Sequence, residues 1–340
     1  MAKFEPGNAR AWAMESLRGV SGCILPSFTL DQTGLNEAAI RHDIQREREL
    51  GFTGFLIVGE CGTSPEELER FVEISVEEAG DDLVTIVQAA AGTLAENLAI
   101  VEMAAAKGVD LVMPSYPISF YPQHYKEIVE YTRAIADAGD LGVVVFAMNL
   151  WNFMRLHPSG FAPDWLEEIV ETIPNVVAIK NEIGDPGVAG LAEVFRRFSD
   201  RVIVADPLEM NAPAWSSTFG MPWMGTSNYE YFGDVVPRIH ALAQDPERFD
   251  EAMELYWRVH PARAATGALM REANAGTSFV HRLLWKYQGW LQGFNGGPVR
   301  SPHTRLHDRQ MRQLRSAAIE AGLPITDEDD ALFFEGRIRG

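Results

Sequence analysis

The sequence contains little cysteine: Cys23 and Cys61 are the only two in 340 residues. Two cysteines are too few for a disulfide framework, and they do not have the spacing of a metal-binding motif. The sequence therefore predicts no metal site. Such sparing use of cysteine is typical of proteins in a reducing compartment, so we expect a cytoplasmic location.

Positive charge is also scarce. Lys and Arg together number 29, against 48 for Asp and Glu, which gives a formal net charge of −19 and an isoelectric point near 4.8. An acidic surface repels phosphate backbones and anionic membranes unless a local basic stripe compensates, and the sequence has no such stripe. We therefore expect no nucleic-acid partner.

Long apolar runs are missing as well. No stretch of about 18 apolar residues occurs, so the sequence predicts no transmembrane helix and no membrane partner. The first ten residues lack the basic start and apolar run of a signal peptide. With 46% hydrophobic and 23% charged residues, the composition is that of a soluble globular protein, which excludes the disordered and fibrous classes.

Short β-branched or apolar segments alternate with amphipathic segments over the first two-thirds of the chain. The predicted strands are 20–28, 54–59, 83–91, 111–116, 143–149, 175–181, 201–206 and 223–228. The segments between them, such as 35–50, 65–79, 95–107 and 125–138, carry apolar residues three and four apart, as helices do. This α/β pattern predicts a (β/α)8 TIM barrel. A doubly wound open sheet is the main alternative, but no glycine-rich fingerprint follows the first strand.

The alternation stops near residue 243. Beyond it the sequence shows three helical patterns, 246–262, 271–291 and 307–321, and ends in a strongly acidic stretch at 326–330. We therefore predict a barrel domain over 1–243 and, over 244–340, a C-terminal helical extension packed on the barrel. The acidic end is expected to be a mobile tail.

Lysine is rare, and one of the five lysines has an unusual position. Lys180 directly follows the apolar run 176–179, so it should emerge at the carboxyl end of the sixth strand, where active sites of this fold lie. A buried amine responds to burial with a lowered pKa and can then attack a carbonyl. The structural alternative is an ion pair between Lys180 and Glu60, Glu182 or Asp185.

The loop after the second predicted strand has the sequence Gly-Glu-Cys-Gly-Thr-Ser-Pro and opens a helix. Gly59 and Gly62 allow the backbone to approach a ligand closely, and Thr63 and Ser64 offer hydroxyl groups. A helix N-terminus attracts a carboxylate. A helix cap without a ligand explains the same residues.

The segment Ile-Lys-Asn-Glu-Ile-Gly-Asp at 179–185 resembles the lysine strand of the dihydrodipicolinate synthase / N-acetylneuraminate lyase family of class I aldolases. The resemblance extends over most of the chain, including the loop at 59–63, the segment 113–116, the segment 203–206 and the C-terminal helices. The length of the chain and the segment 293–300 resemble most the branch of hydratase-aldolases for arylidene-pyruvates. Sugar-acid dehydratases are close neighbours of that branch.

This resemblance implies that Lys180 forms an imine with a 2-oxo acid, whose carboxylate the loop at 59–64 would hold. It implies no separate cofactor, because the lysine imine is itself the electrophile. It also implies a homo-oligomer, either a homotetramer or a homodimer. The loop departs from the family pattern Gly-Thr-Thr-Gly-Glu, since the two threonines are absent from their usual places.

A second departure concerns proton transfer. The fifth strand of the family ends in a tyrosine, but this sequence has Phe146 there, and a phenyl ring neither donates nor accepts a proton. Tyr116, after the fourth strand, could supply the missing hydroxyl. Asn149 could correspond to an asparagine of the hydratase-aldolase branch. We therefore predict catalytic roles for Lys180, Tyr116 and Asn149.

Aromatic side chains are frequent near the predicted barrel mouth. If Phe146, Trp151 and Trp223 line the substrate pocket, the substrate should carry an aromatic or hydrophobic group. Packing against the barrel or a partner subunit is the alternative for such side chains. Glu60 and Asp206 are candidate carboxylates near the lysine, and their sequence context does not separate a general base from a counter-ion.

These features predict a lyase of the hydratase-aldolase type that cleaves an aromatic or hydrophobic 2-oxo acid into pyruvate and an aldehyde. One alternative is a 2-oxo acid dehydratase or decarboxylase that uses the same lysine imine. The other is a catalytically silent barrel that binds a keto acid.

Overall fold

The computed structural model describes residues 2–182, 188–274, 282–301 and 305–339. Within these ranges, eight strands form a parallel sheet in the order β7-β6-β5-β4-β3-β2-β1-β8. They are β1 Gly19–Ile24, β2 Gly54–Ile57, β3 Val84–Ala89, β4 Leu111–Pro114, β5 Gly142–Ala147, β6 Val176–Asn181, β7 Ile203–Ala205 and β8 Trp223–Gly225. The two ends of this order, β7 and β8, lie next to each other. The predicted TIM barrel is confirmed.

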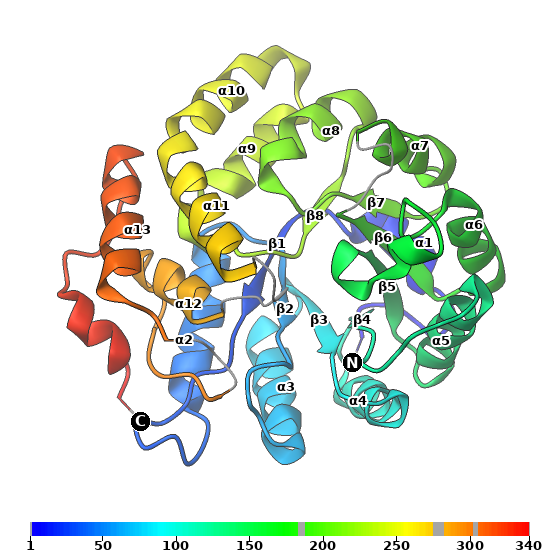
Figure 1. Cartoon of the computed structure of the whole chain (residues 1–340), viewed down its shortest axis with the longest axis horizontal. Coiled ribbons are helices and arrows are strands. Elements are labelled where there is room, and N and C mark those ends of the chain that lie inside the picture. Colours follow the sequence, from blue (N-terminus) through cyan, green and yellow to red (C-terminus); the bar gives the residue numbers. More distant parts are fainter. Residues whose placement is uncertain (1, 183–187, 275–281, 302–304, 340) are drawn as a thin grey trace.

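Helices surround the strands, as Figure 1 shows. Those of the barrel are α2 Glu37–Glu49, α3 Pro65–Ala79, α4 Leu94–Lys107, α5 Tyr125–Asp137, α6 Pro163–Thr172, α7 Val188–Phe198, α8 Ala212–Phe219 and α9 Val235–Ala243. Local sequence explains where they begin. At α3, the Ser64 hydroxyl accepts a hydrogen bond from the Glu67 amide, the Glu67 carboxylate accepts one from the Ser64 amide, and Pro65 occupies the first helical position.

The side chains of each strand alternate between two apolar layers. On β3, Val84 and Ile86 face the inner core of the barrel, whereas Val87 and Ala89 pack against the outer helices. On β2, Leu56 belongs to the inner core. This period of two follows from strand geometry, and it decides which residues at the strand ends point into the barrel mouth.

An N-terminal helix that the sequence patterns did not predict, α1 Ala9–Ser16, covers the amino-terminal end of the barrel. Ala13 and Leu17 are fully buried in the inner core. The Arg10 guanidinium donates to the carbonyl oxygens of Val170 (2.9 Å), Ile173 (2.8 Å) and Val176 (2.8 Å). These contacts hold α1 at the start of β6.

The C-terminal extension lies at one side of the barrel, beside α2 and α9, where it is coloured yellow to red in Figure 1. Its helices are α10 Phe249–Arg258, α11 His260–Asn274, α12 Arg282–Leu291 and α13 Asp308–Glu320. The predicted boundaries differ in two places. The segment 246–262 is divided between a 3-10 turn, α10 and the start of α11, and the segment 271–291 contains the end of α11 and all of α12.

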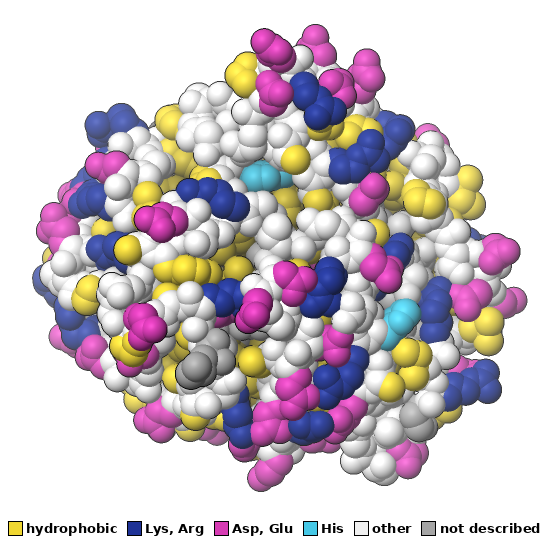
Figure 2. Space-filling view, turned by 180° about the vertical axis from the view of Figure 1, so that it is seen from behind, with side chains coloured by type: hydrophobic (Ala, Val, Ile, Leu, Met, Phe, Trp, Pro, Cys, Tyr) yellow, Lys and Arg dark blue, Asp and Glu magenta, His cyan; other side chains and the backbone are white. Residues whose placement is uncertain are grey.

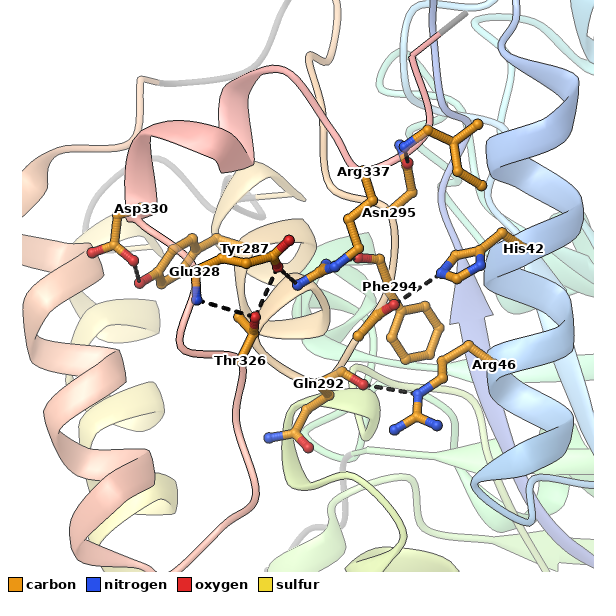
Figure 3. A network of polar contacts seen from close by, with 12 residues as sticks. His42, Arg46, Tyr287, Gln292, Phe294, Asn295, Thr326, Glu328, Asp330 and Arg337 are labelled. Carbon is orange, nitrogen blue, oxygen red and sulfur yellow. Dashed lines mark hydrogen bonds and ion pairs between the residues drawn. The ribbon is translucent and has the colours of Figure 1, made fainter.

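Side chains of α2 form hydrogen bonds to the backbone of the extension. His42 Nε2 lies 2.9 Å from the Gly293 carbonyl oxygen, and Arg46 donates to the Gln292 carbonyl oxygen at 2.8 Å (Figure 3). The Asn295 amide donates to the Asp43 carboxylate. The chain after α12 therefore packs directly on the barrel.

The acidic segment 326–330, which the sequence predicts as a mobile tail, and the residues that follow it are packed against the C-terminal helices in this structure. The side chain of Phe333 is fully buried against Tyr287 and Trp290. The Asp330 carboxylate accepts hydrogen bonds from Tyr287 (2.8 Å) and from Arg315 (2.9 Å). Figure 3 shows the further contacts around Glu328 and Arg337. Glu328 and Asp330 thus have arginine partners, and a buried aromatic ring anchors the segment.

On the face shown in Figure 2, acidic and basic side chains are interspersed. Ion pairs such as Arg70–Glu37, with 2.7 Å between nitrogen and oxygen, neutralise part of the acidic surface. None of the helices in the described ranges is long and apolar enough to cross a bilayer.

Candidate active site

Lys180 lies where the sequence placed it, near the carboxyl end of β6, and its side chain points into the barrel mouth. It is almost completely buried. Its Nζ donates to the Thr226 carbonyl oxygen at 2.8 Å and lies 3.4 Å from the Thr226 hydroxyl. Thr226 directly follows β8. The sulfur of Met113, on β4, lies 3.9 Å from the same nitrogen.

The surroundings of Lys180 lower its pKa. The main cause is the loss of solvent on burial, and the nearby Arg282 guanidinium acts in the same direction, whereas the Glu182 carboxylate, 3.6 Å away, opposes it. On the other side, the Phe146 ring centroid lies 3.9 Å from Nζ. The neutral, nucleophilic form of the amine is therefore more populated here than in an exposed lysine.

The candidate Glu60 lies in a polar cluster whose other members, Gln88, Ser115 and Arg282, the sequence reasoning missed. The Gln88 side-chain amide donates to Glu60 Oε2 at 3.1 Å and to the Ser115 hydroxyl at 3.3 Å. Arg282, from α12, donates through Nε to Glu60 Oε1 at 2.9 Å. The strand period could have identified Gln88, because it shares the inward face of β3 with Val84 and Ile86.

The carboxylates at the mouth, those of Glu60 and Glu182, are more exposed to solvent than Lys180. The Glu60 side chain is 35% exposed and that of Glu182 is 25% exposed, against 4% for Lys180. Within the described residues, we find no group of three or more His, Cys, Asp or Glu side chains arranged to hold a metal ion. Of the ion pairs that the sequence offered as a structural role for Lys180, the one with Glu182 is present. Asp185 lies outside the described residues.

The loop at 59–64 is used mainly for packing and helix capping. A side chain at Gly59 would approach the Gln88 carbonyl oxygen, and one at Gly62 would collide with Arg300 and Ser301 of the extension. The Ser64 hydroxyl caps α3 and lies 2.9 Å from a Glu66 carboxylate oxygen. Thr63 is partly exposed at the start of this cap.

Tyr116 packs in an aromatic cluster that also includes Trp151. Its ring packs among aromatic side chains outside the strands, including Phe120 and Phe153. Its hydroxyl lies 3.4 Å from that of Thr132, on α5. The Lys180 amine donates to Thr226, and the catalytic role of Tyr116 stays a prediction. The side chain of Asn149 lies outside the described part of the chain.

Trp223 does not lie at the mouth as predicted, whereas Asp206 directly follows β7 at the mouth end of the barrel, close enough to Glu182 for their charges to interact. Trp223 begins β8, pairs with Gly19 at the amino end of β1, and is fully buried with its indole NH on the Ser21 hydroxyl at 2.9 Å. It is therefore a core residue at the end of the barrel opposite the mouth. Asp206 faces the β7–α8 turn, where its carboxylate accepts hydrogen bonds from the Leu208 amide, Asn211 and Trp215.

Trp151 does lie beside the lysine site. Its indole NH donates to the Phe146 carbonyl oxygen at 2.8 Å, and its ring stands edge-on to that of Phe146. It is only partly buried. Phe146 and Trp151 thus form an apolar side of the mouth at the end of β5, whereas Glu60 and Gln88 of the polar cluster lie at the ends of β2 and β3.

The profile of the Dihydrodipicolinate synthetase family matches residues 16–205, which is more than half of the chain. The chain belongs to this family. A probable 5-dehydro-4-deoxyglucarate dehydratase of Saccharopolyspora erythraea is 26% identical to the chain over 322 residues, covering 88% of the chain and 92% of the relative. An N-acetylneuraminate lyase of Escherichia coli is 30% identical over 175 residues, covering 50% of the chain and 56% of that relative.

Solved structures agree with this fold. N-acetylneuraminate lyase from Fusobacterium nucleatum superposes with a TM-score of 0.73 at 18% identity, covering 89% of the chain and 98% of the lyase. DHDPS from Cyanidioschyzon merolae with lysine bound gives 0.75 at 19% identity, covering 90% and 99%. The family membership predicted from 179–185 is confirmed, although residues 183–185 of that segment lie outside the described ranges.

Proposed function

We propose that this protein is a lyase that forms an imine between Lys180 and a 2-oxo acid. The observation that carries the proposal is the placement of Lys180: its amine is buried at the carboxyl end of β6, and burial lowers its pKa. Membership of the family supports this role. The lysine itself supplies the electrophile, so the reaction requires no separate cofactor.

The neutral amine attacks the carbonyl carbon of the 2-oxo acid. The carbonyl oxygen takes up both amine protons and leaves as water, and one further proton gives the iminium ion. The iminium nitrogen accepts the electron pair that is released when a proton leaves C3. Glu182, whose carboxylate lies 3.6 Å from Nζ, is positioned to accept that proton. Water finally hydrolyses the imine and frees Lys180.

Of the reactions open to this imine, we propose elimination of a hydroxyl group at C4, that is, dehydration of a polar 2-oxo acid. The electron pair from C3 expels the hydroxyl, which leaves as water after protonation. The charged and amide groups of Glu60, Gln88 and Arg282 support this choice, because a site for a hydroxylated substrate needs such hydrogen-bonding partners. The similarity to a probable dehydratase over most of the chain supports it further.

Hydratase-aldolase cleavage is the second candidate, and a specific observation favours it. Phe146 and Trp151 form an apolar side of the mouth, against which an aryl group could pack. Trp223 adds nothing to this surface, because it lies in the core at the other end of the barrel.

Reductive trapping tests the proposal. The protein is incubated with cyanoborohydride and a panel of 2-oxo acids, and intact mass and peptide mapping locate the adduct. We expect one adduct on Lys180, absent from Lys180→Ala. A wild-type protein that traps no 2-oxo acid overturns the imine proposal and leaves the silent barrel. Product analysis with a hydroxylated 2-oxo acid and an arylidene-pyruvate then separates dehydration from aldol cleavage.

A further inference from the structure

The mouth of the barrel contains a buried arginine that comes from the C-terminal extension. The Arg282 side chain is only 8% exposed, and its guanidinium carbon lies 4.6 Å from the Trp285 ring centroid. Both Nε and Nη2 face Glu60 Oε1. Arg282 is close enough to Lys180 for its charge to lower the pKa of the lysine.

A 2-oxo acid brings a carboxylate into this mouth, directly beside the carbonyl group that Lys180 attacks. The side chains of the loop at 59–64 include no positive charge to pair with it. Ser64 is engaged in capping α3, Gly62 packs on Arg300, and the buried Cys61 thiol has a pKa raised to about 12 by the loss of solvent. The negative charge of the substrate therefore needs another partner.

We propose that Arg282 binds the carboxylate of the 2-oxo acid, and that the Glu60 carboxylate occupies this position when no substrate is present. The inference rests on the proposed imine-forming function. A planar guanidinium matches a carboxylate in a two-point, charge-assisted contact. Glu60 presents the same group to Arg282 and so marks the place that a substrate carboxylate takes.

The two partners differ in how easily they move. Glu60 is 35% exposed, so its carboxylate regains water when it turns outward. Arg282 is buried and stacked on Trp285, so its guanidinium stays in the mouth. The exchange keeps a buried cation paired, which avoids the large cost of leaving it alone. Substrate carboxylate thus replaces Glu60 without a change of charge at the arginine.

The test compares pyruvate with methyl pyruvate, a carbonyl compound that has no carboxylate. Cyanoborohydride trapping on Lys180 is followed at increasing concentrations of each compound. For Arg282→Gln we expect the half-saturating pyruvate concentration to rise about 10- to 100-fold, in keeping with the loss of a charge-assisted hydrogen bond. The half-saturating concentration of methyl pyruvate should change less than about threefold, and Arg282→Lys should give an intermediate result for pyruvate.

Arg263→Gln is the matched control. Arg263 is also buried, but it pairs with Glu209 at 3.0 Å and lies 4.0 Å from the Tyr256 ring centroid, whereas Arg282 pairs with Glu60. This variant should leave pyruvate trapping unchanged. Glu60→Gln should lower the half-saturating pyruvate concentration, because Arg282 then has no carboxylate to release.

The outcomes separate this inference from the proposed function. If wild-type protein traps no 2-oxo acid, the function itself fails. If wild type traps pyruvate on Lys180 but both Arg282 variants have the wild-type half-saturating concentration, the arginine does not bind the carboxylate. Equal losses for pyruvate and methyl pyruvate also overturn the inference, since they reveal general damage to the mouth. An increase in the half-saturating pyruvate concentration in Glu60→Gln contradicts the exchange with Glu60.

Discussion

The Nζ atom of Lys180 lies 3.9 Å from the centroid of the Phe146 ring, at the end of two neighbouring strands. The ring covers one side of the amine and offers no proton donor or acceptor. The Lys180 amine lies 3.4 Å from the hydroxyl of Thr226, which directly follows β8. Proton transfer at the imine must therefore use groups other than residue 146.

Replacing Phe146 by Tyr tests whether the site is arranged around an apolar ring. We expect Phe146→Tyr to leave the rate of imine trapping unchanged or to lower it, because a phenol at this position has no hydrogen-bond partner prepared for it. The rate of trapping with pyruvate is the measurement. A large increase in aldol cleavage would instead identify a damaged aldolase site that the tyrosine repairs.

Thr226 is the candidate for the hydroxyl that assists imine formation. We expect Thr226→Val to slow trapping by about tenfold or more, since positioned acid–base groups contribute roughly 10² to 10⁴ in rate. Thr226→Ser should retain most of the rate because it keeps the hydroxyl.

Tyr116→Phe is the comparison for that experiment. Its hydroxyl faces Thr132 on α5, so we expect trapping within about twofold of wild type and a stability loss of about 0.5–1.5 kcal/mol, the usual net value of one hydrogen bond. If Tyr116→Phe slows trapping as much as Thr226→Val, the hydroxyl of Tyr116 takes part after all.

The charges beside Lys180 should set the pH dependence of trapping. The Glu182 carboxylate raises the pKa of the lysine, and the Arg282 guanidinium lowers it. Imine formation needs the neutral amine, so Glu182→Gln should move the rise of the trapping rate to lower pH. Arg282→Gln should move it to higher pH. Rates at saturating pyruvate over a range of pH measure both shifts, and shifts of equal sign would contradict the assignment.

Two buried carboxyl groups beside β1 should make stability depend on pH. Glu230 and Glu47 face each other beside β1, and burial raises the pKa of Glu230 to about 7 and that of Glu47 well above its usual value. The folded protein therefore binds more protons than the unfolded chain between about pH 4.5 and 7, and stability falls as pH rises through that window.

Glu230→Gln removes one of these groups. We expect the variant to be more stable than wild type by about 1–3 kcal/mol at pH 7.5 and closer to wild type at pH 5, because the neutral amide does not have to ionise. Urea unfolding at the two pH values measures the difference. A variant with the full pH dependence of wild type would show that the carboxyl pair is not its source.

The C-terminal segment should contribute strongly to stability. Phe333 is fully buried against Tyr287 and Trp290, so Phe333→Ala should lower the free energy of unfolding by about 3–5 kcal/mol. The neighbouring Phe334 is 45% exposed, and Phe334→Ala is the matched control, with a change of at most about 1 kcal/mol. Equal, small effects in urea unfolding would mean that the segment is not anchored by Phe333.

The sequence by itself determined the features that depend on neighbouring residues. Apolar runs separated by amphipathic segments predicted eight strands and their helices, because period and length are local properties. Ser64 and Pro65 located the start of α3. The run 176–179 followed by Lys180 placed the lysine at the carboxyl end of β6, since a parallel barrel gathers those ends at one mouth.

Tertiary structure decided which distant groups meet. Arg282 and Glu60 are 222 residues apart in the chain, and no local pattern connects an arginine in the extension with the mouth of the barrel. Strand register placed Trp223 beside Gly19, at the end away from the mouth. The acidic tail is docked because its Asp330 pairs with Arg315 of α13 and the ring of Phe333 packs on Trp290 of α12. Composition gives the charge of a segment, but only packing gives it a counter-charge and a buried surface.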